Sequence, residues 1–339
     1  MKRLLLLFAF CLVAAPAIAA PLPIRMVVVT TFQHGEDGFG EMKAWLPEAP
    51  VKLDFAAGDV PLRYDPARGL LVIATGMGSP HAAASIMALG TDARFDLARA
   101  YWLVAAIAGV DPAAGSLGSA AWIGEVVDGD YGFEIDARET PADWPTGKLP
   151  WFRAGPYAPP VPDTADNLFA LNTHLRDWAF NLTKDIRLPD SDAMARGRKG
   201  YAEPAGQRPP FVLTGSEVSG QSWWAGWTAT RHARRWTDYW TSGKGRFVMS
   251  AMEDSGIARA IGLLGRMKLA DPARLMILRT ASDYTAPPPG VSAADYVAAI
   301  QKNVPATREA LAAAYRVGKP VVDEITGHWE KYEKAVPGN

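Results

Sequence analysis

The sequence has 339 residues and a formal net charge of −1, with 36 acidic residues against 35 Lys and Arg. The charges are interspersed and form no basic patch, which argues against a nucleic-acid partner. The single cysteine, Cys11, lies in the N-terminal segment, so the rest of the chain has no disulfide and no thiolate metal site.

The first twenty residues are typical of a secretory signal peptide. A Lys-Arg pair is followed by an apolar run over 4–15 and by the small-x-small pattern Ala-Ile-Ala at 17–19. We place the cleavage after Ala19 or Ala20 and expect a periplasmic protein. No later segment has twenty uninterrupted apolar residues, so we expect a soluble mature chain, forming one domain over 21–339, and not a transmembrane channel.

Apolar runs and helical patterns then alternate along the chain. Strands are predicted at 24–32, 52–58, 70–78, 100–112, 211–220 and 274–284, with a pair in 119–136. Helices are predicted from 42 to near Pro47, after the glycine-rich corner at 75–80, over 166–183, 224–237 and 253–268, and at the C-terminus. Irregular insertions are expected near 137–165 and 189–210. Because most strands are apolar on both faces, we predict an α/β sandwich whose sheet is covered on both sides.

In such folds ligands collect at the C-terminal ends of strands, here TGMGSP, AGVDP, TGSEVSG and SDYT. Gly76 and Gly78, just before Ser79, let backbone N–H groups approach a ligand closely, although a tight turn explains them equally well. Gly109 belongs to a similar corner, where Asp111 favours a turn or a cap.

Two acidic segments point more directly to chemistry. In RTASDY, Ser282 and Asp283 emerge from a buried strand, where a carboxyl group can exchange a proton with a heterocycle. In SAMEDSGIAR, Glu253 can accept hydrogen bonds from two ribose hydroxyls while Met252 packs on the sugar. The alternative for this second segment is an ordinary acidic first turn of a helix, which Asp254 fits.

Neither the histidines nor the serines of the candidate loops form a known catalytic or metal-binding pattern. These residues are His34, His81, His232, Ser79, Ser216 and Ser219. We therefore expect no metal, no cofactor and no serine-hydrolase triad. The twelve tryptophans favour a stacking site for a ring, and extra core mass explains any one of them equally well.

The order of these segments resembles the nucleoside phosphorylase/nucleosidase superfamily. It is more similar to the purine nucleoside permease branch, whose members begin with a signal peptide and carry segments of the MEDSG and RTASDY type. The resemblance spans nearly the whole mature chain. It implies a nucleoside phosphorylase-like fold, a three-layer α/β/α sandwich with a mixed, partly barrel-like central sheet, and a purine nucleoside as ligand.

By motif position, the resemblance implies that Met252 and Glu253 bind ribose and that Asp283, next to Ser282, faces the purine N7 side. Protonating the purine would stabilise a departing base while the ribose gains oxocarbenium character. A ring from the loop after TGSE would stack on the base, and we expect Trp223 or Trp224.

Two departures from relatives bear on the nucleophile. Where phosphorolytic relatives use an Arg and a Ser, this chain has Val104 and Ile107, which would leave a buried phosphate poorly compensated. Hydrolytic relatives carry a Glu near the first strand-to-helix turn, for which Glu36 and Glu41 are candidates. Glu41 is the better one, although a solvated first-turn acid explains it equally well.

These observations leave two functions open. The first is an exported purine-nucleoside-binding protein that supports uptake, which requires a membrane partner such as an inner-membrane transporter. The second is an N-glycosidic enzyme, a nucleoside hydrolase in preference to a phosphorylase. The sequence is compatible with a homo-oligomer. A purely structural or peptide-binding role has no support, because it would not explain the acids of the two segments.

Overall fold

The computed structural model describes residues 20–159 and 167–338, so the predicted leader lies outside it except for Ala20. The strands are β1 (Leu22–Pro23), β2 (Met26–Thr30), β3 (Val51–Leu53), β4 (Leu62–Asp65), β5 (Leu70–Ala74), β6 (Phe95–Asp96), β7 (Tyr101–Val110), β8 (Ala120–Asp128), β9 (Phe133–Glu134), β10 (Lys148–Leu149), β11 (Leu168–Ala170), β12 (Val212–Ser219), β13 (Phe247–Ala251) and β14 (Leu275–Tyr284). The α-helices are α1 (Ser79–Gly90), α2 (Thr173–Thr183), α3 (Asp192–Arg198), α4 (Pro204–Gln207), α5 (Trp227–Thr241), α6 (Asp254–Arg266), α7 (Ala293–Lys302), α8 (Thr307–Gly327) and α9 (Trp329–Tyr332). Two 3-10 helices are η1 (Met42–Glu48) and η2 (Pro272–Arg274).

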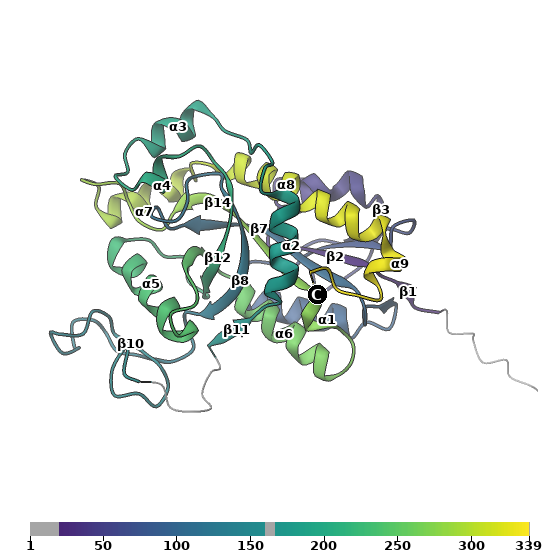
Figure 1. Cartoon of the computed structure of the whole chain (residues 1–339), viewed down its shortest axis with the longest axis horizontal. Helices are drawn as coiled ribbons and strands as arrows, with labels where there is room; N and C mark the ends of the chain where they lie inside the picture. The colour runs from purple at the N-terminus through teal and green to yellow at the C-terminus, as the bar shows by residue number, and fades with distance from the viewer. Residues whose placement is uncertain (1–19, 160–166, 339) are drawn as a thin grey trace, which may run out of the picture.

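A mixed sheet runs through the molecule in the order β11-β8-β12-β13-β7-β2-β5-β4-β3 (Figure 1). Strand β14 pairs with β7 in parallel and with β8 antiparallel. Strand β8 also pairs with β12, β12 pairs with β13, and β13 pairs with β7. Strand β14 therefore closes a ring of five strands. The expected mixed and partly barrel-like sheet is therefore confirmed.

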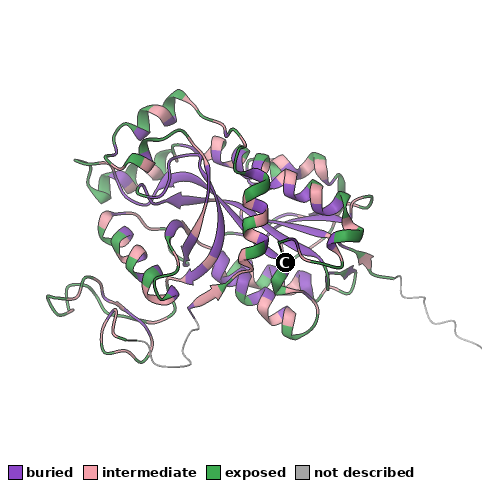
Figure 2. Cartoon of the chain, in the orientation of Figure 1, coloured by how far each residue is buried: buried purple, intermediate pink, exposed green. Residues whose placement is uncertain are grey.

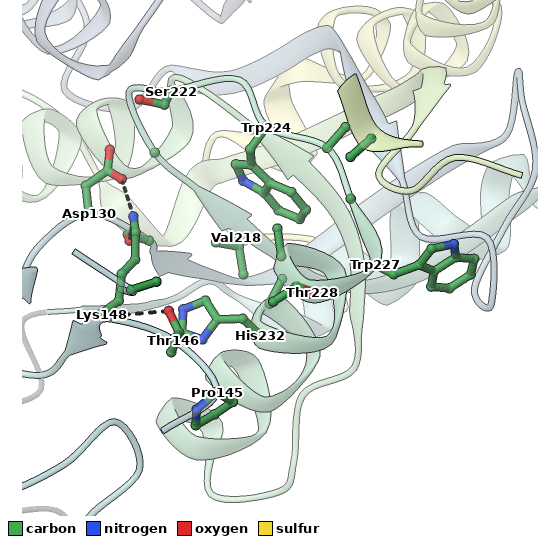
Figure 3. A pocket seen from close by; sticks show the side chains of 18 of the residues that line it. Asp130, Pro145, Thr146, Lys148, Val218, Ser222, Trp224, Trp227, Thr228 and His232 are labelled. Atoms are coloured by element: carbon green, nitrogen blue, oxygen red, sulfur yellow. Dashed lines mark hydrogen bonds and ion pairs between the residues drawn. The ribbon is translucent and has the colours of Figure 1, made fainter. Parts of the chain in front are cut away.

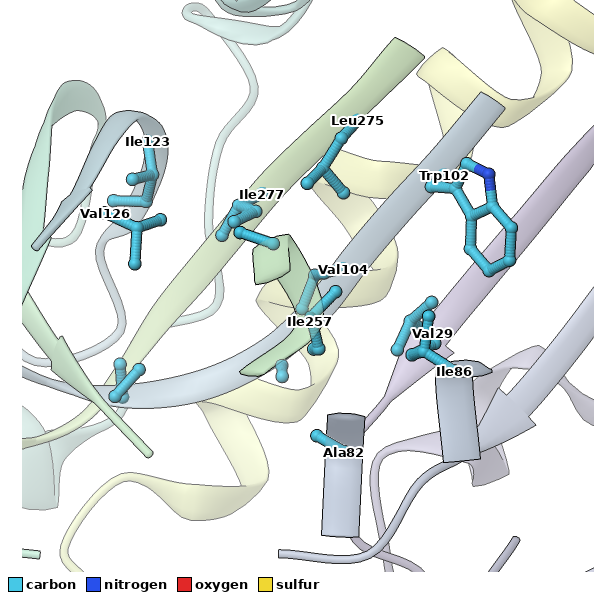
Figure 4. Close-up of a cluster of buried hydrophobic side chains, with 14 of the residues drawn as sticks. Val29, Ala82, Ile86, Trp102, Val104, Ile123, Val126, Ile257, Leu275 and Ile277 are labelled. Atoms are coloured by element: carbon cyan, nitrogen blue, oxygen red, sulfur yellow. The ribbon is translucent and has the colours of Figure 1, made fainter. Parts of the chain in front are cut away.

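Helices cover both faces of the sheet, which gives the predicted three layers. On one face, α1 and α6 pack on alternate residues of β2 and β7, including Val29 and Val104, in the apolar cluster of Figure 4. On the other face, η1, α2 and α8 pack on the intervening residues, among them Met26 and Leu103. Figure 2 shows the same division, with buried strands between helices whose outer surfaces are exposed.

Several short elements differ from the sequence-based expectation. Strand β4 was not predicted, although its residues alternate between buried and half-buried with a two-residue period. Strand β11 is stabilised by pairing with β8, and β13 by pairing with β12 and β7. No local sequence pattern encodes these pairings. The insertion near 189–210 contains α3 and α4. No helix within residues 20–159 and 167–338 is long and apolar enough to cross a membrane.

Candidate functional site

The two acidic segments meet at the C-terminal end of β7. Gly109 of this strand pairs with Ser250 of β13 on one side and with Asp283 of β14 on the other. A Cβ atom at Gly109 would lie 3.0 Å from Asp283 Oδ1, so the absence of a side chain leaves room for that carboxyl group. The sheet thereby places the MEDSG and RTASDY segments on either side of one strand.

A buried arginine organises the MEDSG side. Arg279 Nε and Nη2 donate to the two carboxylate oxygens of Asp254 at 2.7 and 2.6 Å, and Nη2 also lies 3.0 Å from Glu253 Oε2. Its Nη1 donates to the Ile107 carbonyl at 3.0 Å. The neighbouring carboxylates raise the pKa of Arg279 well above its usual value and keep it charged although it is fully buried. Sequence reasoning missed Arg279, although it opens the RTASDY segment.

The glycine-rich corner before α1 completes the environment of Glu253. The N–H of Gly78, a residue with φ of +91°, donates to Glu253 Oε1 at 3.0 Å. Ser79 Oγ donates to the Met252 carbonyl at 2.8 Å, which fixes the backbone just before the acid. Gly76 faces Asp59 instead. Predicted residues from two distant segments are thus brought together, and the Glu253 carboxylate is held by one cation and one backbone donor.

Glu41 lies on the same side as Glu253, immediately before η1. Its Oε2 accepts from the Thr31 N–H and, at 2.9 Å, from the Thr31 hydroxyl, and its Oε1 accepts from the Ile107 N–H at 2.8 Å. Burial raises the pKa of Glu41 to about 7, against the opposing effect of the Arg279 charge and these donors. The carboxyl group therefore changes protonation near neutral pH, and it is not a solvated first-turn acid.

Asp283 forms the other end of the site. It is 4% exposed, and the Ser282 hydroxyl lies 2.9 Å from its Oδ2. Burial raises the pKa of Asp283 to about 6, while hydrogen bonds from Ser282 and the Trp223 indole partly offset the rise. A carboxyl group with this pKa can carry a proton at mildly acidic to neutral pH.

Glu217 of β12 is a further buried acid that sequence reasoning did not single out. In the described part of the chain neither of its carboxyl oxygens meets a donor, and its neighbours include Asp254 and Arg279. Burial, reinforced by the Asp254 charge, raises its pKa well above the ordinary value. A proton on Glu217 lets it donate to Asp254, whereas two ionised carboxylates could only repel each other.

The remaining predicted residues fall into place as follows. Asp254 lies in the first turn of α6, as expected, but it is not an ordinary solvated acid there, because it is fully buried and Arg279 binds it bidentately. Glu36 is a surface residue that pairs with Lys52 at 2.7 Å, with 44% of its side chain exposed. Asp111 accepts from the Ala113 N–H at 2.9 Å, which confirms the turn.

A cavity of about 720 Å³ lies beside the site, between the 129–148 region, the segment after β12 and the start of α5. Figure 3 shows Trp224 on one wall, with His232 and Thr146 across from it, and the Trp227 ring directed away. Trp224 packs on Phe247, and His232 Nδ1 lies 2.6 Å from the Tyr157 hydroxyl. Neither Glu253 nor Asp283 lines this cavity. No group of three His, Cys, Asp or Glu side chains suited to a metal ion occurs in residues 20–159 and 167–338.

Comparison with protein families finds a match over residues 23–337 to the family described as purine nucleoside permease (NUP). The "Probable purine nucleoside permease" of Schizosaccharomyces pombe is 30% identical over 267 residues, which are 75% of this chain and 75% of that protein. The purine nucleoside permease of Candida albicans is 30% identical over 268 residues, 78% of this chain and 65% of that longer protein.

Solved structures share the fold at low sequence identity. The 5′-methylthioadenosine/S-adenosylhomocysteine nucleosidase of Neisseria meningitidis, in complex with methylthio-immucillin-A, has a TM-score of 0.53 at 15% identity and covers 89% of this chain and 99% of its own. The futalosine hydrolase of Helicobacter pylori has a TM-score of 0.54 at 12% identity and covers 89% and 98%. The predicted nucleoside phosphorylase-like fold is therefore confirmed.

Proposed function

The chain belongs to the purine nucleoside permease family, and from that premise we propose that it binds a purine nucleoside and hydrolyses its N-glycosidic bond. The observation that carries this proposal is the pair of buried carboxyl groups, Glu41 and Asp283, whose pKa values are raised to about 7 and about 6. Buried acids that titrate near neutrality are typical of groups that exchange protons with a substrate. The carboxylate of Glu253 stands on the Glu41 side as an anchor for the sugar hydroxyls.

In the proposed reaction Asp283 is the acid and Glu41 is the base. Asp283 gives its proton to the purine ring as the bond from C1′ of the ribose to the base nitrogen breaks. A water molecule attacks C1′ and passes a proton to Glu41. Glu253 holds the ribose hydroxyls while positive charge develops on the ring, and its carboxylate favours that charge.

Water suits this site better than phosphate. The N–H and hydroxyl donors of Thr31, with the N–H of Ile107, point to one position, which the Glu41 carboxylate already fills. A phosphate would have to compete with that carboxylate for the same donors. Arg279 gives no free charge to an anion, because Asp254 and Glu253 already bind it. Val104 is fully buried among apolar side chains and has no hydrogen-bond donor or positive charge for a phosphate.

The second candidate function is a binding component for nucleoside uptake, favoured by the family's description as a permease. We further propose that residues 1–20 direct export to the periplasm, on the basis of their signal-peptide pattern. Such a component would deliver its nucleoside to an inner-membrane transporter. Cell fractionation and N-terminal sequencing of the mature protein test export, and a protein retained in the cytoplasm with residues 1–20 intact would contradict it.

The test of hydrolysis incubates the purified protein with inosine and with adenosine, each with and without phosphate, and measures free base. Base release without phosphate is expected. Release that requires phosphate would overturn the assignment of water, and tight binding without release would favour the uptake component.

Variants assign the roles. Asp283→Asn and Glu41→Gln should each reduce turnover at least a hundredfold with smaller effects on binding, whereas Glu253→Ala should damage both. Glu36→Gln is the matched control, because that acid is half-exposed and paired with Lys52. Full turnover in Asp283→Asn would remove Asp283 from the mechanism.

A further inference from the structure

The cavity of about 720 Å³ adjoins the end of β14 that carries Asp283. Gly226, which lines the cavity, donates its N–H to the Thr285 carbonyl at 2.8 Å. The Thr230 hydroxyl lies 3.0 Å from both the carbonyl and the hydroxyl oxygen of Thr285. A Cβ atom on Gly109 would lie 3.4 Å from Thr285 Cγ2 and 3.0 Å from Asp283 Oδ1, so both side chains face that glycine. One wall of the cavity is therefore bonded to the strand end that holds the proposed acid.

This position places the cavity at the base end of the proposed site and not at the sugar end. It is lined by Gly226 and by Ala293, the first residue of α7, but by neither Gly78 nor Glu253. A nucleoside that spans Glu253 and Asp283 therefore meets the cavity beyond its base. With N7 of a purine turned to Asp283, the neighbouring C6 position lies on the same edge of the ring, and a group attached there leaves the base on the side of this strand end.

Small residues leave the cavity open. Ala229 and Ala233, four residues apart on α5, line it together with Gly220 without filling it. A cavity of this size accommodates a drug-sized molecule. Trp224 supplies a large ring at the wall and packs on Phe247, with ring centroids 6.3 Å apart and planes at 26°. An aromatic ring of a ligand can stack on the part of Trp224 that faces the cavity.

Across from Trp224, His232 offers an unused hydrogen-bonding group (Figure 3). Its Nδ1 lies 2.6 Å from the Tyr157 hydroxyl, whereas its buried Nε2 has no partner within residues 20–159 and 167–338. Burial, together with the positive charges of Lys148 and Arg235, lowers the pKa of His232 to about 4, so the imidazole is uncharged at neutral pH. A buried polar atom without a partner is costly, and a ligand that supplies the partner recovers that cost.

The charges around the cavity do not favour an anion. Among the described residues that line it, Lys148 is the only cation, and its Nζ lies 3.2 Å from Asp130 and donates to the Gly129 carbonyl at 2.9 Å. Asp130 also accepts from the Gln221 N–H. Glu134 adds a second acid to the lining. A phosphate or carboxylate would therefore meet a cation that is already paired.

We propose that this cavity is a subsite for an uncharged, ring-bearing group attached to C6 of the purine, so that nucleosides enlarged at the base are preferred to adenosine and inosine. This inference rests on the proposed function and deepens it, because it names a substrate class. The ring of the attached group stacks on Trp224, and a polar atom on that ring reaches His232 Nε2.

The first experiment compares adenine with N6-benzyladenine by calorimetry, since a free base cannot be hydrolysed. The wild type should bind N6-benzyladenine about tenfold more tightly, because the phenyl ring moves from water into the cavity. N6-(4-carboxybenzyl)adenine adds a negative charge to the same ring and should lose this gain. Equal affinities for adenine and N6-benzyladenine, or an equal gain from the charged ring, overturn the proposal.

The second experiment fills the cavity. Ala229→Phe adds a ring at a position that lines it and should remove the gain from the benzyl group. Arg231→Phe is the matched control, because it adds the same ring to α5 at an exposed residue outside the lining, and it should keep the gain. An unchanged gain in folded Ala229→Phe places the benzyl group elsewhere and overturns the assignment. The comparison of ligands in the wild type needs no variant and decides the matter if Ala229→Phe does not fold.

A third comparison tests His232. At least one of the three N6-hydroxybenzyladenine isomers should bind the wild type about threefold more tightly than N6-benzyladenine, because its hydroxyl meets Nε2. His232→Phe should abolish this difference. The absence of added affinity in all three isomers overturns the role of His232.

These experiments separate the inference from the function on which it rests. A benzyl gain that Ala229→Phe removes supports the subsite even if no base is released from adenosine or inosine, and hydrolysis alone then fails. Base release from adenosine without any gain from the benzyl group leaves the proposed function intact and overturns the subsite. A protein that binds none of these bases and nucleosides overturns both.

Discussion

Replacing Glu41 with glutamine is expected to remove a pH-dependent loss of stability of about 3 kcal/mol. Burial raises the pKa of Glu41 from 4.5 to about 7 in the folded protein, while the unfolded chain keeps the ordinary value. The folded state therefore binds more protons between these two pH values, and the free energy of unfolding falls as pH rises through this window. At about 1.4 kcal/mol per pH unit, the interval corresponds to about 3 kcal/mol by pH 8.

The assay is urea unfolding of the wild type, Glu41→Gln and Glu36→Gln at pH 5 and pH 8. Between the two pH values, the wild type should lose about 2.5 kcal/mol more than Glu41→Gln, because pH 5 is already slightly above the pKa of the unfolded chain. Asp283 and Glu217 are present in both proteins, so their own titrations cancel in this difference. Glu36→Gln should follow the wild type, because Glu36 is half-exposed. Equal losses in the wild type and Glu41→Gln would refute the reasoning.

Three further predictions concern the same site. Arg279→Met should lower the free energy of unfolding at pH 7 by about 3–5 kcal/mol, because two buried carboxylates lose their cation; a loss below about 1 kcal/mol in urea unfolding would contradict the buried ion pairs. Gly78→Ala should lower the free energy of unfolding by about 1–3 kcal/mol, because an alanine at φ of +91° is strained. A Cβ atom added to Gly262, within α6, would have no atom within 4 Å, so Gly262→Ala should raise the free energy of unfolding by up to about 1 kcal/mol. Equal melting temperatures of Gly78→Ala and Gly262→Ala would contradict this expectation. If Asp283 is the acid and Glu41 the base, kcat/KM for inosine should be bell-shaped with its maximum near about pH 6.5, between pKa values of about 6 and about 7, and a flat profile from pH 5 to 8 would exclude this pair.

The long elements were predictable because their signals are local. The continuous apolar run that became β7 and the shorter apolar run over 275–278 that begins β14 both indicate buried strands, and the helical pattern after the Gly78 corner became α1. Short strands were not predictable in the same way. β13 has five residues, and its pairing with β7 and β12 decides it, which no window of sequence encodes.

The sequence by itself indicated the three-layer α/β fold, the family resemblance, and Glu253 and Asp283 as acids worth attention. These follow from the period of apolar residues and from short segments read in order. No sequence pattern indicates that Asp254 is a buried partner of Arg279, because that pairing joins residues 25 positions apart on two different elements.

Only the tertiary structure decided which acids are buried and perturbed. A pKa depends on the dielectric and the charges around a group, and the burial of Glu41, Glu217 and Asp283 arises where several strands and loops converge. Contacts of this kind are set by distance in space, whereas periodicity reports only on neighbours along the chain.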